Sequence, residues 1–264
     1  MQNKTENQAL LGILGGLGPM ASIYFCEMLI SHTSAQRDSD HLNFLLSSRA
    51  DTPDRSSFIL GRSSADPTPA MTEEALRLER AGANIIAIPC NTAHFFYDAI
   101  CDATSVPILN IITETARYCN ASGAKKIGVL ATEGTAASGA YQKFLDRYSI
   151  DVIPLSADEQ STVSSIIFDQ IKRGSDPDIS AFFSVVDSLR RRGAELIVLG
   201  CTELSLIKKR FSLPEYIIDS LELLALSAIV ACGKTPTGFD SSLMSFYHSQ
   251  ISDRSKKSER KDVF

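Results

Sequence analysis

Two of the six cysteines occupy matched positions in an internal repeat, where their thiols are placed for acid–base chemistry. Residues 80–92 read RAGANIIAIPCNT and residues 191–203 read RRGAELIVLGCTE, which aligns Cys90 with Cys201 without a gap. Each cysteine follows a short apolar run, typical of a buried strand, and precedes polar residues. A thiol at the start of a helix has a pKa below its usual value of about 8.5, so we expect thiolate near neutral pH.

Two thiols on opposite sides of one ligand suit a particular reaction. In open parallel sheets, ligands bind beyond the carboxyl ends of the strands, where both cysteines are expected to lie. If the repeats form facing lobes, one thiolate removes a proton from a carbon and the other thiol protonates the opposite face. The pattern therefore predicts inversion at a carbon acid. Core packing is the usual state of a free cysteine, and we expect it for Cys26, Cys101, Cys119 and Cys232.

Short apolar runs alternate with longer helical segments along the chain. Strands are predicted at 10–14, 43–47, 85–88, 108–110, 127–130, 151–154 and 196–199, with a further short one at 217–218. Helices are predicted at 72–81, 139–148, 162–173 and 180–192. Apolar strands of this length, separated by helices, indicate parallel sheets buried on both faces. The predicted fold class is therefore α/β.

The duplication predicts two pseudo-symmetric lobes, each with a mainly parallel sheet flanked by helices, and an active site in the cleft between them. A second pair of segments supports it, since GIL at 12–14 repeats as GVL at 128–130. We expect the first lobe at 1–112, with 213–240 packing back on it, and the second lobe at 113–212. Residues 241–264 are expected to form a largely polar, partly disordered tail.

The composition excludes several classes of function. The chain has 264 residues, 26 lysines and arginines, 31 aspartates and glutamates, and a net charge of -5. This negative charge does not indicate binding to nucleic acid or to an anionic membrane. No apolar run reaches the roughly 18 residues of a membrane span. No export signal is recognised, so we expect a cytoplasmic protein. His32, His41 and His248 lack the spacing of metal ligands, and neither a metal nor a cofactor is expected.

Four motifs carry a resemblance to a known family. They read GILGGLGPMAS at 12–22, PDR at 53–55, PCNTAH at 89–94 and GCTEL at 200–204. In this order they resemble the aspartate/glutamate racemase family, and most closely its aspartate racemases. The resemblance implies racemisation of an acidic amino acid without a cofactor, with Cys90 and Cys201 as the two acid/base groups. It also implies a homodimer.

The resemblance also implies which residues contact the α-amino acid part of the substrate. Asn91, Thr92 and Thr202 would hold the α-carboxylate and help to disperse the charge that develops on deprotonation. The glycine-rich loop after the first strand would close over the substrate, with Leu17 near the bound amino acid.

Two cations match family residues that bind the side-chain carboxylate of the substrate. These are Arg55, whose planar fork suits bidentate binding of a carboxylate, and Lys172. From the residues alone, a solvated loop arginine and a lysine at the C-terminus of a helix remain as alternatives.

Three further residues near the motifs have open roles. His94 is expected either to orient Cys90 through a hydrogen bond or to pack on the first turn of a helix. Glu203 stands where glutamate racemases carry histidine, which favours the aspartate branch. Arg49 stands where relatives often carry a small polar residue.

Other functions compete with racemisation of an acidic amino acid. Gly16, Gly18 and Ala21 fit a relaxed dinucleotide fingerprint, but the next strand ends in SSR at 47–49, without the acidic residue that binds a ribose. Hydantoin racemase, maleate isomerase and arylmalonate decarboxylase are related enzymes that use similar cysteines for other chemistry. A non-catalytic amino-acid-binding protein on the same fold is the alternative from another class.

Overall fold

The structure is a computed structural model that describes residues 9–259, with side chains up to residue 250. Two four-stranded sheets form its frame, in the orders β2-β1-β3-β4 and β6-β5-β7-β8. The first consists of β1 (Leu10–Gly15), β2 (Asn43–Ser48), β3 (Ile85–Ala87) and β4 (Ile108–Leu109). The second consists of β5 (Lys126–Leu130), β6 (Asp151–Ile153), β7 (Leu196–Leu199) and β8 (Ile217–Asp219). The strand pairings in both sheets are parallel, which confirms the α/β class and the two lobes.

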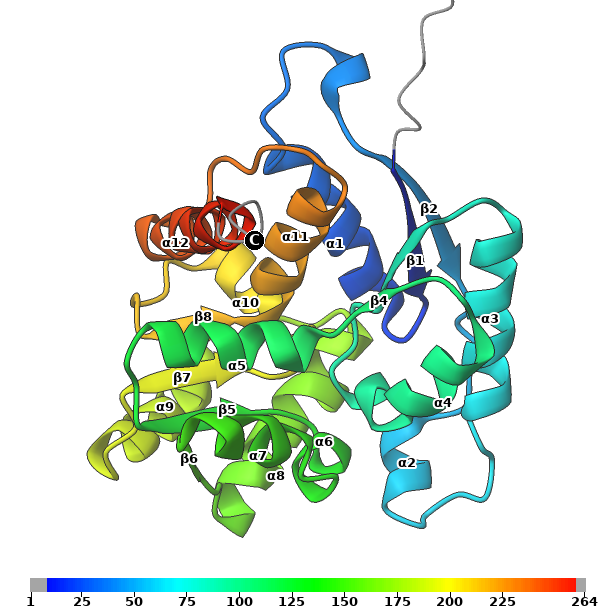
Figure 1. Cartoon of the computed structure of the whole chain (residues 1–264). Coiled ribbons are helices and arrows are strands. Elements are labelled where there is room, and N and C mark those ends of the chain that lie inside the picture. Colours follow the sequence, from blue (N-terminus) through cyan, green and yellow to red (C-terminus); the bar gives the residue numbers. More distant parts are fainter. Residues whose placement is uncertain (1–8, 260–264) are drawn as a thin grey trace, which may run out of the picture.

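Both sheets have the same strand order. In each, the first strand of the lobe is central, the second lies at one edge, and the third and fourth follow on the other side. In Figure 1 the first lobe, in blue and cyan, lies beside the second, in green and yellow. The repeat in the sequence is thus a repeat of topology, in which β1 corresponds to β5 and β3 to β7.

Helices connect most of the strands. The first half of the chain has α1 (Pro19–Ser31), α2 (Arg55–Ile59), α3 (Thr68–Arg80), α4 (Tyr97–Ala103) and α5 (Ile111–Ala121). The second lobe has α6 (Glu133–Ala137), α7 (Ala140–Leu145), α8 (Ala157–Ser165), α9 (Ile179–Arg191) and α10 (Ser205–Arg210). The helix predicted at 162–173 is only partly an α-helix in the structure. Helix α8 begins before the predicted start, and a π-helical turn (Ile166–Gln170) and a 3-10 turn (Ile171–Arg173) follow it.

A glycine in each central strand lets a helix approach closely. A Cβ on Gly12 would lie 3.1 Å from the Cβ of Leu78 in α3, and a Cβ on Gly128 would lie 2.7 Å from Cδ1 of Leu189 in α9. Close-packed interiors leave no room for such an added atom. The repeated glycines are therefore explained by the helix before the third strand of each lobe, which packs against the central strand.

Helix α11 (Ser220–Ala231) joins the two lobes. It is buried along most of its length and contacts α1, α5, β3 and β4, and Figure 1 shows it in orange between α1 and α5. The expectation that residues 213–240 pack on the first lobe is wrong for β8, which pairs with β7 in the second sheet. Asp219 ends β8 and caps α11 by accepting from the Leu221 N–H at 2.8 Å.

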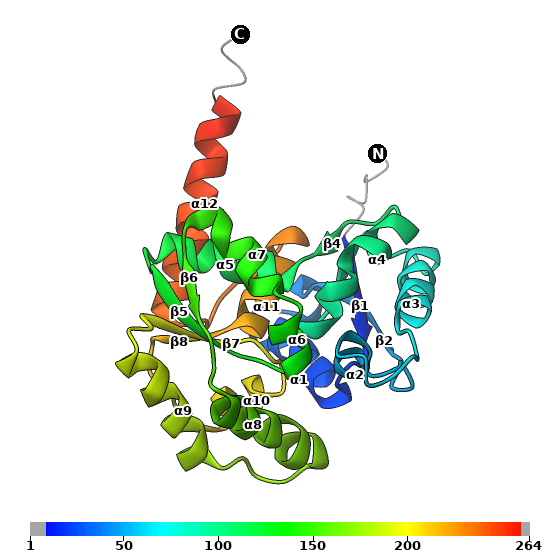
Figure 2. The same cartoon turned by 90° about the horizontal axis from the view of Figure 1, so that it is seen from below.

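The C-terminal segment begins as a packed helix where a polar tail was expected. Figure 2 shows α12 (Ser241–Glu259) extending away from the body toward the C-terminus. Leu243 and Phe246 are buried, and the Phe246 ring meets Tyr118 of α5 edge-on at 5.3 Å. The tail expectation is wrong here because apolar residues three apart form one helix face; residues 260–264 lie outside the described residues. Within the described chain no helix is both long and apolar enough to cross a membrane.

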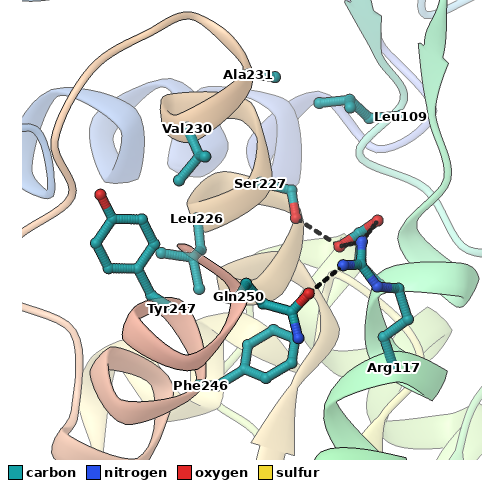
Figure 3. Close-up of a pocket in the computed structure, with 10 residues that line it drawn as sticks. Leu109, Arg117, Leu226, Ser227, Val230, Ala231, Phe246, Tyr247 and Gln250 are labelled. Atoms are coloured by element: carbon teal, nitrogen blue, oxygen red, sulfur yellow. Dashed lines mark hydrogen bonds and ion pairs between the residues drawn. The ribbon is translucent and has the colours of Figure 1, made fainter. Parts of the chain in front are cut away.

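A groove between α5, α11 and α12 is lined by apolar side chains and by a small group of polar ones (Figure 3). Arg117 donates to both carboxylate oxygens of Glu114 at 3.1 Å and also to Gln250, and Ser227 donates to Glu114 at 2.9 Å. These polar groups are paired with one another. The groove contains none of the residues predicted for the active site.

Candidate active site

The two cysteines of the repeat lie at matched ends of the two sheets. Cys90 follows β3 and Cys201 follows β7, which are the third strands of their lobes. Their exposed fractions are 7% and 6%, so both are almost completely buried. The structure gives the two residues equivalent places in their lobes, as expected from the repeat.

The loop after β1 connects the surroundings of the two thiols. The Leu17 carbonyl accepts from Cys90 Sγ at 3.9 Å. The next residue, Gly18, lies against Glu203, which is hydrogen-bonded to Cys201. A Cβ on Gly18 would collide with Glu203 Oε1, so no larger residue fits there without displacing the carboxylate. Adjacent residues of one loop thus contact both thiol sites, which brings the cysteines of the two lobes to a common region.

An ion pair between the partly exposed Lys172 and the buried Glu203 lies beside Cys201. Its Sγ donates to Glu203 Oε2 at 2.9 Å, and Glu203 Oε1 pairs with Lys172 Nζ at 2.6 Å. Burial and the charge of Glu203 raise the pKa of Cys201 well above its usual value. Burial lowers the pKa of Lys172, but the charges of Glu203 and Cys201 outweigh burial and raise it overall. The expected lowering of the thiol pKa is therefore wrong for Cys201, because a carboxylate stands next to the thiol.

Arg55 is a buried residue with 9% of its surface exposed, so the alternative of a solvated loop arginine is wrong. Asp54 caps α2 and thereby places Arg55 in its first turn. Nη1 donates to the carbonyls of Thr52 and Pro53 at 3.2 and 3.1 Å, and Nη2 donates to the Leu17 carbonyl. Nε has no partner among the described residues. The Nε–H group is therefore left for a ligand.

Thr92 belongs to a cluster of four buried hydroxyl groups. Its Oγ1 lies 3.0 Å from Thr132 Oγ1 and 2.8 Å from Thr135 Oγ1. Ser56 donates to Thr132 at 3.2 Å, so the cluster crosses from the first lobe to the second. Our sequence reasoning missed Ser56, Thr132 and Thr135. The repeat held a signal for Thr132, because the loop after β5 is the counterpart of the glycine-rich loop after β1.

The side chains of Asn91 and Thr202 bond to the protein. Asn91 Nδ2 donates to Ser220 Oγ at 3.1 Å, and its Oδ1 accepts from the Tyr141 hydroxyl at 2.7 Å. Thr202 Oγ1 donates to the Pro89 carbonyl at 3.3 Å. These hydrogen bonds connect the segments that follow Cys90 and Cys201 each to residues of the other lobe. The Asn91 and Thr202 side chains therefore already hold the site together, and their backbone groups are the simplest donors left for a substrate.

His94 contacts the backbone of Cys90 and not its thiol. Nδ1 donates to the Cys90 carbonyl at 2.8 Å, and Nε2 accepts from the Ile111 N–H at 3.2 Å. Because Nε2 must accept, the proton lies on Nδ1. Burial lowers the pKa of His94 to about 4, so the imidazole is neutral. His94 therefore fixes the turn after β3 relative to the start of α5.

We expect His94 to make the protein less stable as the pH falls from about 6.5 towards 4. The unfolded chain binds a proton near pH 6.5, whereas the folded protein resists protonation until about pH 4. The stability contribution is complete above pH 6.5 and decreases by roughly 3 kcal/mol through this interval. Urea unfolding at several pH values should show a shallower acid dependence for His94→Gln than for the wild type. Equal slopes would contradict a buried neutral histidine.

Arg49 points its guanidinium group at carboxylates and not at the cysteines. It pairs with Glu73 at 2.6 Å, Asp51 at 3.3 Å and Glu74 at 3.4 Å. Partly exposed pairs of this kind contribute little to stability individually. Arg49 is thus explained by its own ion pairs.

The surroundings of the loop after β1 do not suit a dinucleotide. A pyrophosphate binds where backbone N–H groups and positive charge converge, but Gly18 lies against the Glu203 carboxylate. Among the residues that the structure describes, no group of three or more His, Cys, Asp or Glu side chains could hold a metal ion.

Comparison with known proteins identifies the class to which this fold and site belong. The family model for Asp/Glu/Hydantoin racemase matches residues 14–228. The chain therefore belongs to this family, which confirms the resemblance carried by the four motifs.

Individual relatives agree with this assignment. A broad-specificity amino-acid racemase of Bacillus subtilis is 31% identical over 226 residues, covering 83% of this chain and 96% of that protein. The aspartate racemase of Picrophilus torridus has a similar structure, with a TM-score of 0.77 and 30% identity over 87% of this chain and 96% of that chain. The glutamate racemase of Aquifex pyrophilus, at 23% identity and a TM-score of 0.54, shares the fold over 84% of this chain and 83% of its own.

Proposed function

We propose that this protein is a cofactor-independent aspartate racemase in which Cys90 and Cys201 form the acid/base pair. The observation that carries the proposal is the convergence of two buried thiols, from matched strand ends of two lobes, on one loop. Membership of the Asp/Glu/Hydantoin racemase family supports the reaction class. Similarity to an aspartate racemase over 87% of the chain supports the substrate.

Each turnover moves one proton off Cα and another onto it. One cysteine takes the Cα proton as a thiolate, and the other, as a thiol, protonates the opposite face; the bound enantiomer decides which acts first. Without a cofactor to accept the electrons, preorganised donors must stabilise the developing negative charge. The hydroxyl cluster at Thr92 and the backbone N–H groups of Asn91 and Thr202 are our proposed donors to the α-carboxylate.

The side-chain carboxylate of aspartate is proposed to bind between two cations, the buried Arg55 and the partly exposed Lys172. Arg55 offers its free Nε, and Lys172 offers an ammonium group in contact with Glu203. Charge-assisted hydrogen bonds are about twice as strong as neutral ones, and burial limits their screening by water. An amino acid with a neutral side chain would leave these cations without a new partner.

Substrate entry requires the loop after β1 to move. Leu17 is only 3% exposed and its carbonyl contacts both Cys90 and Arg55. We propose that Leu17 withdraws to admit the amino acid and then closes over it. Closure would exclude water and strengthen the electrostatic interactions in the site.

A second candidate is a racemase of broader specificity. The observation that favours it is the 31% identity to the broad-specificity amino-acid racemase of Bacillus subtilis, which this chain covers over 96% of its length. Glutamate, one methylene longer than aspartate, is the first alternative substrate.

Circular dichroism of amino-acid solutions tests the proposed function. Purified protein is incubated without added cofactor with each enantiomer of aspartate, glutamate and alanine. We expect both aspartate solutions to lose their optical signal and converge on the racemate, with glutamate slower and alanine slowest. Comparable rates for all three would favour broad specificity. If calorimetry shows that aspartate binds and no amino acid is racemised, the protein is a non-catalytic amino-acid-binding protein.

A homodimer stays a prediction taken from the family resemblance. Light scattering from the purified chain measures it directly, and a molar mass near twice that of the 28.7 kDa chain is expected. The monomer mass would contradict it.

A further inference from the structure

Three polar side chains, two of them buried, form a row beside the loop after β1. The ammonium group of Lys172 contacts one oxygen of Glu203 at 2.6 Å, and the Cys201 thiol donates to the other oxygen at 2.9 Å. The Glu203 side chain is 8% exposed and that of Lys172 is 29% exposed. Gly18 lies against Glu203, and its lack of a side chain leaves room for the carboxylate. One carboxylate is therefore shared between the Lys172 ammonium group and the sulfur atom proposed to exchange the Cα proton.

The proposed function does not by itself explain how Cys201 becomes a thiolate. In the structure its proton is held in a hydrogen bond to Glu203. Lys172 and Cys201 share this carboxylate, one on each oxygen. A cation beside a carboxylate opposes the transfer of a proton to it, and this opposition is lost if the cation is drawn to another anion. An acidic substrate brings such an anion to the site.

We infer that Lys172 and Glu203 form a substrate-operated switch for Cys201. The side-chain carboxylate of an acidic amino acid draws Lys172 away from Glu203, and the released carboxylate then accepts the Cys201 proton. This inference rests on the proposed racemase function and assigns Glu203 as a positioning and proton-accepting residue. Recognition of the acidic side chain is thereby coupled to the activation of the thiol and does not serve binding alone.

The position of Lys172 suits this exchange. It lies in the 3-10 turn (Ile171–Arg173) that follows the π-helical turn after α8, so it is attached to an irregular segment and not to a straight helix. Burial lowers the pKa of Lys172, and the charges of Glu203, Cys201 and Cys90 raise it. A flexible lysine stem allows the ammonium group to move between two carboxylates without a change in the backbone.

The proton balance of the cycle closes. The S–H bond of Cys201 breaks and its proton moves to Glu203 Oε2. The Cys201 thiolate then takes the Cα proton, and Cys90 gives its own proton to the opposite face of Cα. The enzyme is left with protonated Glu203, the Cys201 thiol and a Cys90 thiolate. Transfer of the Glu203 proton to water, and of one proton from water to Cys90, restores the starting state.

Glu203→Gln tests the switch. The amide keeps the shape of the side chain, but it is not a base and cannot take the proton of the thiol. We expect kcat for at least one enantiomer of aspartate to fall at least about 100-fold, within the usual range for loss of an acid/base group, while KM changes little. Glu222→Gln is the matched control, since Glu222 pairs with Lys208 at 2.6 Å outside the site. A racemase that retains full kcat in Glu203→Gln would overturn the switch and leave the proposed function intact.

Succinate titration of the wild type provides a readout that does not depend on turnover. Succinate carries two carboxylates and no amino group, so we expect it to increase the ultraviolet absorbance of thiolate. The increase should be absent in Cys201→Ala and Glu203→Gln, whereas butyrate should have no effect on any of them. A thiolate signal that is present before succinate is added, or equal with butyrate, would contradict the switch. A wild type that racemises no amino acid would instead overturn the proposed function on which the switch depends.

Lys172→Gln provides a second variant with an opposite signature. Without the ammonium group, Glu203 has no cation beside it whether or not an acidic substrate is bound. Alanine and aspartate should therefore be racemised at similar kcat values. We expect the aspartate-to-alanine ratio of kcat to fall at least about tenfold. An unchanged kcat ratio with a raised KM for aspartate would assign Lys172 to binding only and overturn the coupling.

Discussion

Racemisation of aspartate is expected to fall at least about 1,000-fold when either Cys90 or Cys201 is replaced by alanine. In the proposed mechanism each thiol serves one face of Cα, and alanine removes the group that carries a proton there. Loss of one acid/base group lowers rates by about 100- to 10,000-fold, and inversion uses both groups in every turnover. The measurement is kcat from both enantiomers, because a one-sided defect would distinguish the two thiols.

Cys101→Ala is the matched control for these replacements. Cys101 lies in α4, is partly exposed, and belongs to no part of the proposed site. It should retain the activity of the wild type. Thermal unfolding should show that all three alanine variants fold cooperatively. Full racemase activity in either Cys90→Ala or Cys201→Ala would contradict the two-thiol mechanism.

Replacement of Arg55 by lysine is expected to lower kcat/KM for aspartate by roughly 10- to 100-fold. The guanidinium group donates to the carbonyls of Thr52, Pro53 and Leu17, and its unpartnered Nε is the donor proposed to bind the substrate. A lysine ammonium cannot reach all these positions. Hydrogen bonds to charged groups contribute about 1.5–3 kcal/mol each, which corresponds to this range of rates. Initial rates with aspartate and alanine measure the loss and its selectivity.

Arg62→Lys controls for the change of side chain. Arg62 is exposed and pairs with Glu133 at 2.7 Å across the two lobes. An exposed pair of this kind contributes at most about 1 kcal/mol, so the activity should change little. If Arg55→Lys also keeps its preference for aspartate over alanine, Arg55 does not bind the side-chain carboxylate.

The repeat in the sequence predicted the frame of the molecule. Alignment of Cys90 with Cys201 placed both residues after the third strand of a lobe, and the two sheets have the same strand order. This succeeded because apolar strands and glycines that allow close packing are local features with a direct sequence pattern. The packed part of α12 was not predicted, since Leu243 and Phe246 are few among polar residues and find their partners only in the folded chain.

The environment of each thiol could not be read from the sequence. Lys172 and Glu203 are 31 positions apart in the chain, and their contact depends on the irregular turns after α8. Proximity to a helix start suggested a lowered pKa for Cys201, whereas the carboxylate beside it raises the pKa. The hydroxyl cluster likewise combines Thr92 of one lobe with Thr132 and Thr135 of the other. Such pairs are set by the tertiary arrangement of the lobes.

Proton NMR of L-aspartate in D2O, with the protein and no added cofactor, tests the central claim most directly. A two-thiol racemase replaces the Cα proton with deuterium as it forms D-aspartate, so the Cα signal should disappear while both enantiomers accumulate to equal amounts. Cys101→Ala should behave as the wild type does. A Cα signal that persists while aspartate remains bound would contradict the racemase account.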